Sequence, residues 1–256
     1  IFYGGEIGEM IVNSVKKAGG IMTLKDLVNY KSIWREPVKF KYKNLDIISM
    51  SLPSSGGILI GQMLKVIEDY DIKSFGHNSV KVIQLLVEAE RRAYADRSHF
   101  MGDPDYMDLP VYELMDKEYV VDRMKNFSWD KATSSSDVKH GNIILNESDE
   151  TTHYSIIDKY GNSVSVTTTL NNSYGSKVFV EEGGFFLNNE MDDFSSKPGH
   201  PNFYGLIGSE ANSIQPGKRM LSSMTPSIIL KNNKPSLIVG TPGGSTIITS
   251  VLQTIL

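Results

Sequence analysis

The chain has 256 residues, of which 40% are hydrophobic and 22% are charged, which is ordinary for a globular protein with one large domain or two small ones. Its formal net charge is −4 and it has no clustered basic stripe, so nucleic acid and anionic membranes are disfavoured as partners. It contains no cysteine, which excludes disulfides, cysteine-ligated metals and a cysteine nucleophile.

Apolar periodicity and capping residues predict that the first part of the chain is mainly helical. The expected elements are helices at 6–18, from 23, at 58–70, at 78–100 and within 111–127, with a hairpin at 38–48. In the long helix we expect Asn78 as the N-cap. Its buried side is predicted to hold Val80, Ile83, Val87, Ala89 and Ala93, and its solvent side Glu88, Glu90, Arg91 and Arg92.

Two polar segments in this part invite a functional interpretation. The run Ser54-Ser55-Gly56-Gly57 lets backbone come close to a ligand or to a neighbouring element, and the second is the commoner case. Asp103, Asp105 and Asp108 resemble a calcium loop but lack the glycine and closing glutamate of that motif. We therefore interpret these aspartates as turn and cap residues, and no metal site is predicted.

The pattern changes at residue 151. Residues 129–150 are polar and weakly patterned, which is typical of a flexible linker. From Thr151 the chain alternates with period two, turns at 159–162 and continues as a β-branched run to Leu170, which predicts a hairpin. Further on we expect a hairpin within 176–186, a long loop at 195–211, paired strands at 227–230 and 237–240, and a helix at 245–256 capped by Ser245.

Thr151 stands where the linker meets the first strand of that hairpin. A threonine hydroxyl is a weak nucleophile unless a base lies beside it, and the α-amine of the same residue serves once the preceding peptide bond is cut. Because an α-amine has a pKa of about 8, part of it is neutral near pH 7. Cleavage between Glu150 and Thr151 would free such an amine, but the local pattern alone favours an ordinary edge-strand threonine after a loop.

The longer pattern resembles a known family. The segment TTHYSI at 151–156, followed by Gly161-Asn162, Thr169-Leu170-Asn171 and Tyr174-Gly175, closely resembles the signature of the γ-glutamyltransferases, which belong to the N-terminal-nucleophile hydrolases. The stretches AYADRSHFMGDP, LNNEMDDF, PNFYGLIG, KRMLSSMTPSII and GTPGGS also look like the family and occur in the expected order. The resemblance covers nearly all of the chain.

The resemblance implies an α+β fold and a two-part organisation. The fold would be a four-layer αββα sandwich, with residues 1–150 as the C-terminal part of a large subunit and 151–256 as a small-subunit region cut from the same precursor. Both ends read as truncated, since Ile1 is not an initiator methionine and the chain stops within an apolar helical run. Family members are exported to the periplasm, the medium or the outer cell surface, and no apolar run here reaches the roughly 18 residues that span a bilayer.

The resemblance also implies a reaction. Thr151 would free its own amine by cleavage after Glu150, then attack a γ-glutamyl amide, with glutathione as the expected class of donor. The acyl group would pass to water or to the amine of an amino acid or peptide, and no cofactor is implied. Thr169 would orient Thr151, while Gly243 and Gly244 would form the oxyanion hole. A phosphate loop is the rival interpretation of these glycines, and the absence of a following lysine argues against it.

The donor's charged groups need opposite partners. By resemblance the ammonium pocket consists of Asn171, Glu190 and Asp193. The carboxylate side consists of Ser222 and Ser223, and the lid carries Tyr204. The arginine that the family supplies to the carboxylate lies upstream of Ile1. The motif of that family arginine is matched by none of the chain's own arginines: Arg35, Arg91, Arg92, Arg97, Arg123 and Arg219. His153 has no partners at ligand spacing, so we expect it to be structural.

Two alternatives stay open at this point. One is a related amidohydrolase, such as a poly-γ-glutamate depolymerase or a cephalosporin acylase. The predicted ammonium and carboxylate pockets favour a free γ-glutamyl donor over these. The other is a catalytically inactive fragment, which the missing arginine and the apparent truncation would explain.

Overall fold

The computed structural model describes residues 1–138, 151–195, 197–198, 200 and 208–256. The chain forms two compact units, one of Ile1–Glu36 with Thr169–Glu190 and the other of Pro37–Thr168 with Met191–Leu256. Helices and antiparallel strands occur together, which confirms the α+β class. Among the described residues, none of the helices combines the length and apolar character that crossing a bilayer requires.

The smaller unit holds α1 (Glu6–Lys17), α2 (Leu24–Asn29) and the two-residue strands β5 (Phe179–Val180) and β6 (Phe185–Phe186). The predicted capping box of α2 is present, because the Thr23 N–H donates to the Asp26 carboxylate at 2.8 Å. β5 and β6 form the hairpin expected within 176–186, and Gly184 in its turn has a φ of 71°.

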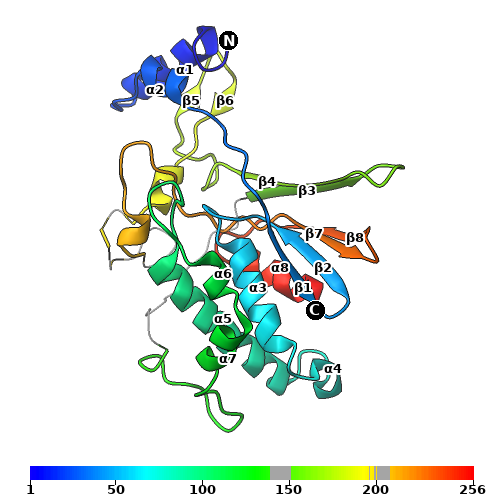
Figure 1. The fold of residues 1–256 in the computed structure, drawn as a ribbon. Helices are drawn as coiled ribbons and strands as arrows, with labels where there is room; N and C mark the ends of the chain where they lie inside the picture. The colour runs from blue at the N-terminus through cyan, green and yellow to red at the C-terminus, as the bar shows by residue number, and fades with distance from the viewer. Residues whose placement is uncertain (139–150, 196, 199, 201–207) are drawn as a thin grey trace. The chain divides into compact units, whose positions relative to one another are not determined.

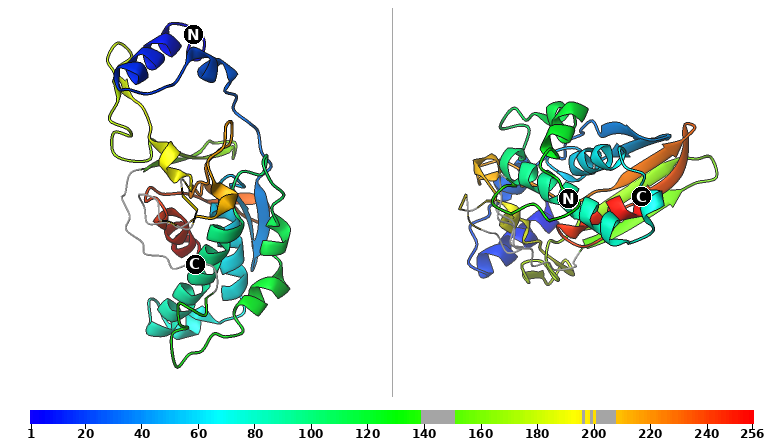
Figure 2. Two further views of the ribbon diagram at one scale, coloured as in Figure 1. Left: turned by 90° about the vertical axis from the view of Figure 1, so that its left-hand side faces the viewer. Right: turned by 90° about the horizontal axis from the view of Figure 1, so that it is seen from below.

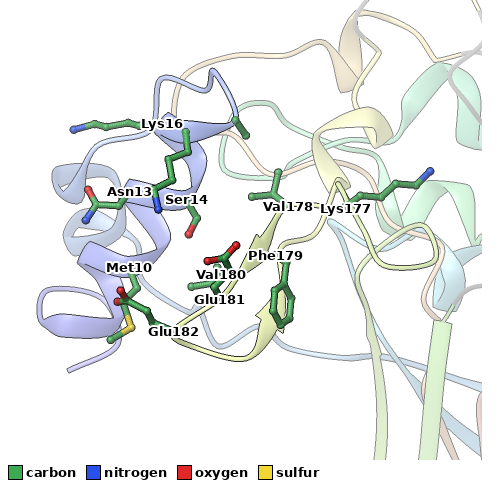
Figure 3. Close-up of a pocket in the computed structure, with 12 residues that line it drawn as sticks. Met10, Asn13, Ser14, Lys16, Lys177, Val178, Phe179, Val180, Glu181 and Glu182 are labelled. Atoms are coloured by element: carbon green, nitrogen blue, oxygen red, sulfur yellow. The ribbon is translucent and has the colours of Figure 1, made fainter.

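An open pocket of about 750 Å³ lies in this unit between α1 and the segment that contains β5 (Figure 3). Its charged lining comes from Lys16, Lys17 and Lys177 on one hand and from Glu181 and Glu182 on the other. Of the predicted active-site residues that the structure describes, none lines this pocket.

The larger unit is built on a four-stranded antiparallel sheet in the order β1-β2-β7-β8 (Figure 1). Its strands are β1 (Val38–Tyr42), β2 (Leu45–Ser49), β7 (Ser227–Lys231) and β8 (Lys234–Val239). Both predicted hairpins are confirmed. The β7–β8 turn places Asn232 and Asn233 at φ values of 52° and 59°, the left-handed pair that a tight hairpin requires.

Helices cover one face of this sheet. α3 (Gly56–Ile67) packs against β1, β2 and α5 (Val80–Phe100), with α8 (Thr246–Ile255) beside it (Figures 1 and 2). Every residue of α3 except Lys65 is buried, as expected of a helix that is apolar all round. The shorter helices are α4 (Ile72–Phe75), α6 (Val111–Leu114) and α7 (Lys117–Arg123).

The predicted hairpin after residue 150 forms a second sheet, of β3 (Thr151–Ile157) and β4 (Ser163–Thr169). Two serine side chains attach it to β8: Ser155 Oγ donates to the Ile238 carbonyl at 3.0 Å, and Ser165 Oγ donates to the Val239 carbonyl at 3.2 Å. In Figure 1 the hairpin runs above β7 and β8, while α3 and α8 lie below them. Two sheets and a helical layer are therefore stacked in this unit.

The expectation for the long helix α5 is wrong in two respects. Ser79 caps it, accepting from the Val82 N–H at 3.3 Å, whereas Asn78 precedes the cap with a φ of 52°. Glu88 and Arg92 are 2% and 4% exposed, while Val80 is 80% exposed. The two charged groups form a buried ion pair of 2.5 Å, which makes burial of this face tolerable.

Residues 123–133 supply the remaining hydrogen-bond partners of that buried pair. Arg92 donates to the carbonyl of Arg123, to Asn126 Oδ1 and to Thr133 Oγ1. The Thr133 N–H in turn donates to the Glu88 carboxylate at 3.0 Å. Burial by itself raises the pKa of Glu88, but the bonds from Arg92 and Thr133 outweigh it and bring that pKa below its usual value.

Candidate active site

Thr151 and Thr169 are the first and the last residues of the β3–β4 hairpin. Thr151 is the first residue of β3 and Thr169 is the last residue of β4, and both are half-buried. Thr169 Oγ1 accepts a hydrogen bond of 2.9 Å from the Asn171 N–H, which fixes the chain as it leaves β4. Glu150, the predicted partner of Thr151 in cleavage, lies outside the described residues, as does the lid residue Tyr204.

His153 lies two residues beyond Thr151 and is held by the strands around it. Its Nδ1 pairs with Thr167 Oγ1 at 2.8 Å and its Nε2 with Ser155 Oγ at 3.0 Å. A Cβ added at Gly240 would come within 2.2 Å of the ring, so the backbone directly after β8 packs closely on it. Burial lowers the pKa of His153, which keeps the ring neutral. These contacts agree with a structural histidine.

The predicted oxyanion hole lies directly before α8. Gly243 and Gly244 have φ values of 130° and 51°, which side chains other than glycine adopt rarely. Their carbonyls accept from Thr246 and Ile247 and so start the helix. Within the described residues, the N–H groups of these two glycines donate to no acceptor. Ser245 occupies the predicted N-cap position, although its side chain makes no cap hydrogen bond.

The serine segment, residues 222–225, is held against residues 53–56. The Ser222 N–H donates to the Pro53 carbonyl at 2.8 Å, and the Ser55 N–H donates to the Ser222 carbonyl at 3.0 Å. A Cβ on Gly56 would meet Thr225 Oγ1 at 2.1 Å. The Ser-Gly run before α3 thus serves the close approach of a neighbouring element.

Arg97, near the end of α5, reaches the same segment. It is 5% exposed, and it donates from Nε to Ser55 Oγ at 2.9 Å and from Nη2 to Ser223 Oγ at 3.0 Å. Burial lowers the pKa of Arg97, while the phenol of Tyr94 and the carboxylate of Asp193 act in the opposite direction. Sequence reasoning found no role for this arginine, although it lies in one of the family-like stretches.

Asp193 is tied to the serine segment through Asn212. The side-chain amide of Asn212 donates to the Asp193 carbonyl at 2.7 Å and its Oδ1 accepts from the Leu221 N–H at 2.9 Å. Asn212 was also missed, because an isolated asparagine directly after a predicted loop carries no sequence signal. Asp103 accepts hydrogen bonds from the N–H groups of Asp105 and Arg219, and the first of these makes it the turn residue expected.

The other two predicted ammonium ligands belong to the smaller unit. Asn171 is 9% exposed with a φ of 73°, and its side chain donates to the Asn189 carbonyl at 3.2 Å. Glu190 begins a 3₁₀ turn, Glu190–Asp193. Burial raises the pKa of Glu190, because its carboxylate lies in a partly desolvated place.

The comparisons with known proteins agree with the resemblance seen in the sequence. Residues 1–256 match the family described as gamma-glutamyltranspeptidase. A protein of Escherichia coli K12 named glutathione hydrolase proenzyme is 47% identical over 252 residues, which are 98% of this chain and 43% of that protein.

Two solved structures are similar. A cephalosporin acylase from Bacillus halodurans superposes over 99% of this chain and 43% of its own, with a TM-score of 0.77 and 22% identity. The gamma-glutamyltranspeptidase of Helicobacter pylori covers 54% of this chain and 40% of its own, with a TM-score of 0.52 and 43% identity.

The fold is therefore that of the N-terminal-nucleophile hydrolases, as the family resemblance implied. Within that class the chain belongs to the gamma-glutamyltranspeptidase family. It spans less than half the length of the curated relative named above.

Proposed function

We propose that the protein containing this chain is a γ-glutamyltransferase and glutathione hydrolase with Thr151 as its N-terminal nucleophile. The family match over residues 1–256, with Thr151 as the first residue of β3, carries the proposal. The 47% identity to a protein named glutathione hydrolase proenzyme favours glutathione as the class of donor.

The reaction begins with maturation. The Thr151 hydroxyl oxygen attacks the Glu150 carbonyl carbon, the peptide C–N bond breaks, and the hydroxyl proton passes to the departing nitrogen. Water then hydrolyses the ester and leaves Thr151 with a free α-amine. Residues 1–150 and 151–256 thereby become parts of a large and a small subunit from one precursor.

The mature nucleophile acts on the donor in two steps. The α-amine accepts the Thr151 hydroxyl proton while the oxygen attacks the γ-carbonyl carbon, and the rest of the donor leaves as a free amine. Water, or the amine of an amino acid or peptide, then attacks the ester and releases the γ-glutamyl group. Thr169 orients the nucleophile, and the N–H groups of Gly243 and Gly244 stabilise the oxyanion in both steps.

Recognition of the donor uses its two charged ends. The ammonium group is bound by Asn171, Glu190 and Asp193, and the carboxylate by the hydroxyl groups of Ser222 and Ser223. Tyr204 closes over the bound donor. The protein acts in the periplasm or outside the cell, as the family resemblance implies.

Intact mass and turnover test this proposal in the complete protein. Mature wild-type protein should contain two polypeptides separated before Thr151 and should release the chromophore from a γ-glutamyl anilide. Thr151→Ala should stay uncut and inactive, whereas Thr168→Ala, an exposed threonine of β4, should mature and turn over normally. Turnover that survives Thr151→Ala would refute the mechanism.

A further inference from the structure

Arg97 is a buried cation whose place the fold alone does not explain. Its side chain is 5% exposed, and in the described part of the chain it forms no ion pair within 4.0 Å. Both of its hydrogen bonds instead go to serine hydroxyls, those of Ser55 and Ser223. The Asp193 carboxylate acts on the guanidinium without forming an ion pair, and it offsets the cost of burial only in part. Burying a guanidinium that is not fully paired is costly, which points to a use for the charge.

The bond from Arg97 fixes how Ser223 can act. A guanidinium only donates, so the Ser223 oxygen accepts and its single proton is left to be donated elsewhere. Ser222 is set in the same way, because its Oγ accepts from the Met224 N–H at 3.1 Å. Among the described residues, neither hydroxyl donates a bond to a protein acceptor. The two neighbouring hydroxyls are therefore both oriented as donors, as an anion requires.

Ser55 connects the Arg97 guanidinium to the serine segment. Its hydroxyl accepts from Arg97 Nε and donates to the Ser222 carbonyl at 3.0 Å, so it is satisfied in both directions. Ser54 adds a bond of 2.6 Å to the Met224 carbonyl. Backbone and side-chain bonds thus fix the serine segment and the arginine relative to each other, and neither is free to turn away.

We propose that Arg97 is a positioning residue for the donor's α-carboxylate, acting through Ser223 and adding positive charge behind the two serine hydroxyls. The proposal rests on the function proposed above, in which Ser222 and Ser223 bind that carboxylate. Arg97 does not touch the donor itself, so it complements a direct cationic partner and does not replace one.

The test compares two donors in the complete protein. One is a γ-glutamyl anilide and the other is the 4-aminobutanoyl anilide, which lacks only the α-carboxylate. Arg97→Gln should raise KM for the first donor by about ten- to a hundredfold, the loss expected for a hydrogen bond to a charged group, and change kcat much less. It should leave kcat/KM for the carboxylate-free donor unchanged within about twofold.

Two further variants separate positioning from a general structural role. Arg97→Lys keeps the charge and should recover part of the lost affinity, and it serves as the main variant if Arg97→Gln does not mature. Arg91→Gln is the matched control, because Arg91 lies on the same helix and bonds to Glu88 and Ser135. It should leave the ratio between the two donors unchanged.

The outcomes are distinguishable from failure of the proposed function. If Thr151→Ala still turns over the γ-glutamyl donor, the proposed function is wrong whatever Arg97 does. If Thr151→Ala is inactive and the Arg97 variants lose activity equally on both donors, or lose none, Arg97 does not position the carboxylate. A loss confined to the carboxylate-bearing donor supports the proposal.

Discussion

The side-chain amide of Asn212 donates to the backbone carbonyl of Asp193 at 2.7 Å, across 19 residues of chain. The same side chain accepts from the Leu221 N–H, one residue before Ser222, and it is 5% exposed. One buried amide therefore joins the segment with a proposed ammonium ligand to the segment with the proposed carboxylate ligands. The distance between the proposed ammonium ligand Asp193 and the proposed carboxylate ligands therefore depends on Asn212, which has no role in the chemistry.

Asn212→Asp tests that connection, because it keeps the shape and replaces the donor by a second acceptor. A buried carbonyl and a carboxylate would then face each other, at a cost of about 1–3 kcal/mol. Donor KM should rise about five- to a hundredfold, with kcat affected less, in steady-state assays of the complete protein. Asn232→Asp in the exposed β7–β8 turn is the control. Equal KM values for the two variants would contradict the prediction.

Glu190 gives a pH dependence with a defined sign. Burial raises its pKa, so the protonated form, which cannot attract an ammonium group, persists above the ordinary glutamate value of about 4.3. The value of kcat/KM should therefore fall as the pH decreases through that raised pKa. Glu190→Gln should remove this acidic limb and lower the plateau.

The control for Glu190 is Glu182→Gln, an exposed position in the β5–β6 turn. Its pH profile should follow that of the wild type, once loss of folded protein at low pH has been measured separately. An acidic limb that persists unchanged in Glu190→Gln would show that another group controls it.

Local sequence patterns predicted the hairpins well and the long-range polar contacts poorly. Alternation and the Asn232-Asn233 turn were sufficient for β7–β8, because register in a hairpin follows from neighbours. The buried face of α5 was predicted only in part: Ala89 and Ala93 are buried as expected. Glu88 and Arg92 look like solvent residues in the sequence, and only their contacts with residues 123–133 explain their burial. No period in the sequence indicates that an arginine will meet a serine 126 residues later, as Arg97 meets Ser223.

The site itself was predicted by resemblance more than by spacing. Composition and alternation left Thr151 as an ordinary strand threonine, and only the matched motifs assigned it a reaction. Arg97 lies in a matched stretch but was assigned no role, and Asn212 lies outside the matched stretches. Both hold other residues, and that contribution depends on three-dimensional contact. Glu150 and Tyr204 lie outside the described residues, and their roles stay predictions.

Gly244→Ala tests the oxyanion hole. Gly244 has a φ of 51°, where a Cβ costs about 1–2 kcal/mol, and relief of that strain would turn its N–H away from the oxyanion. Loss of one such donor lowers kcat by about 10²–10³. Gly161→Ala is the matched control, with a φ of 88° and nothing within 4 Å of an added Cβ. If both variants keep wild-type kcat while maturing fully, the predicted hole is wrong.

Glu88→Gln should destabilise the protein without acting on the site. It leaves the guanidinium of Arg92, 4% exposed, without its carboxylate, and breaking a buried pair in this way costs about 3–5 kcal/mol. The exposed Glu118→Gln on α7 is the control, with an expected change below about 0.5 kcal/mol. Denaturant midpoints of the complete protein measure both.

The pH dependence of the same pair has a definite direction. Because the pKa of Glu88 in the folded protein is lowered, its contribution to stability is fully present above the ordinary glutamate pKa of about 4.3 and is lost as the pH falls through the lower folded value. The difference in stability between wild type and Glu88→Gln should therefore shrink on acidification. A difference that stays constant from pH 7 down to the acid transition would mean that the carboxylate is not held ionised by Arg92.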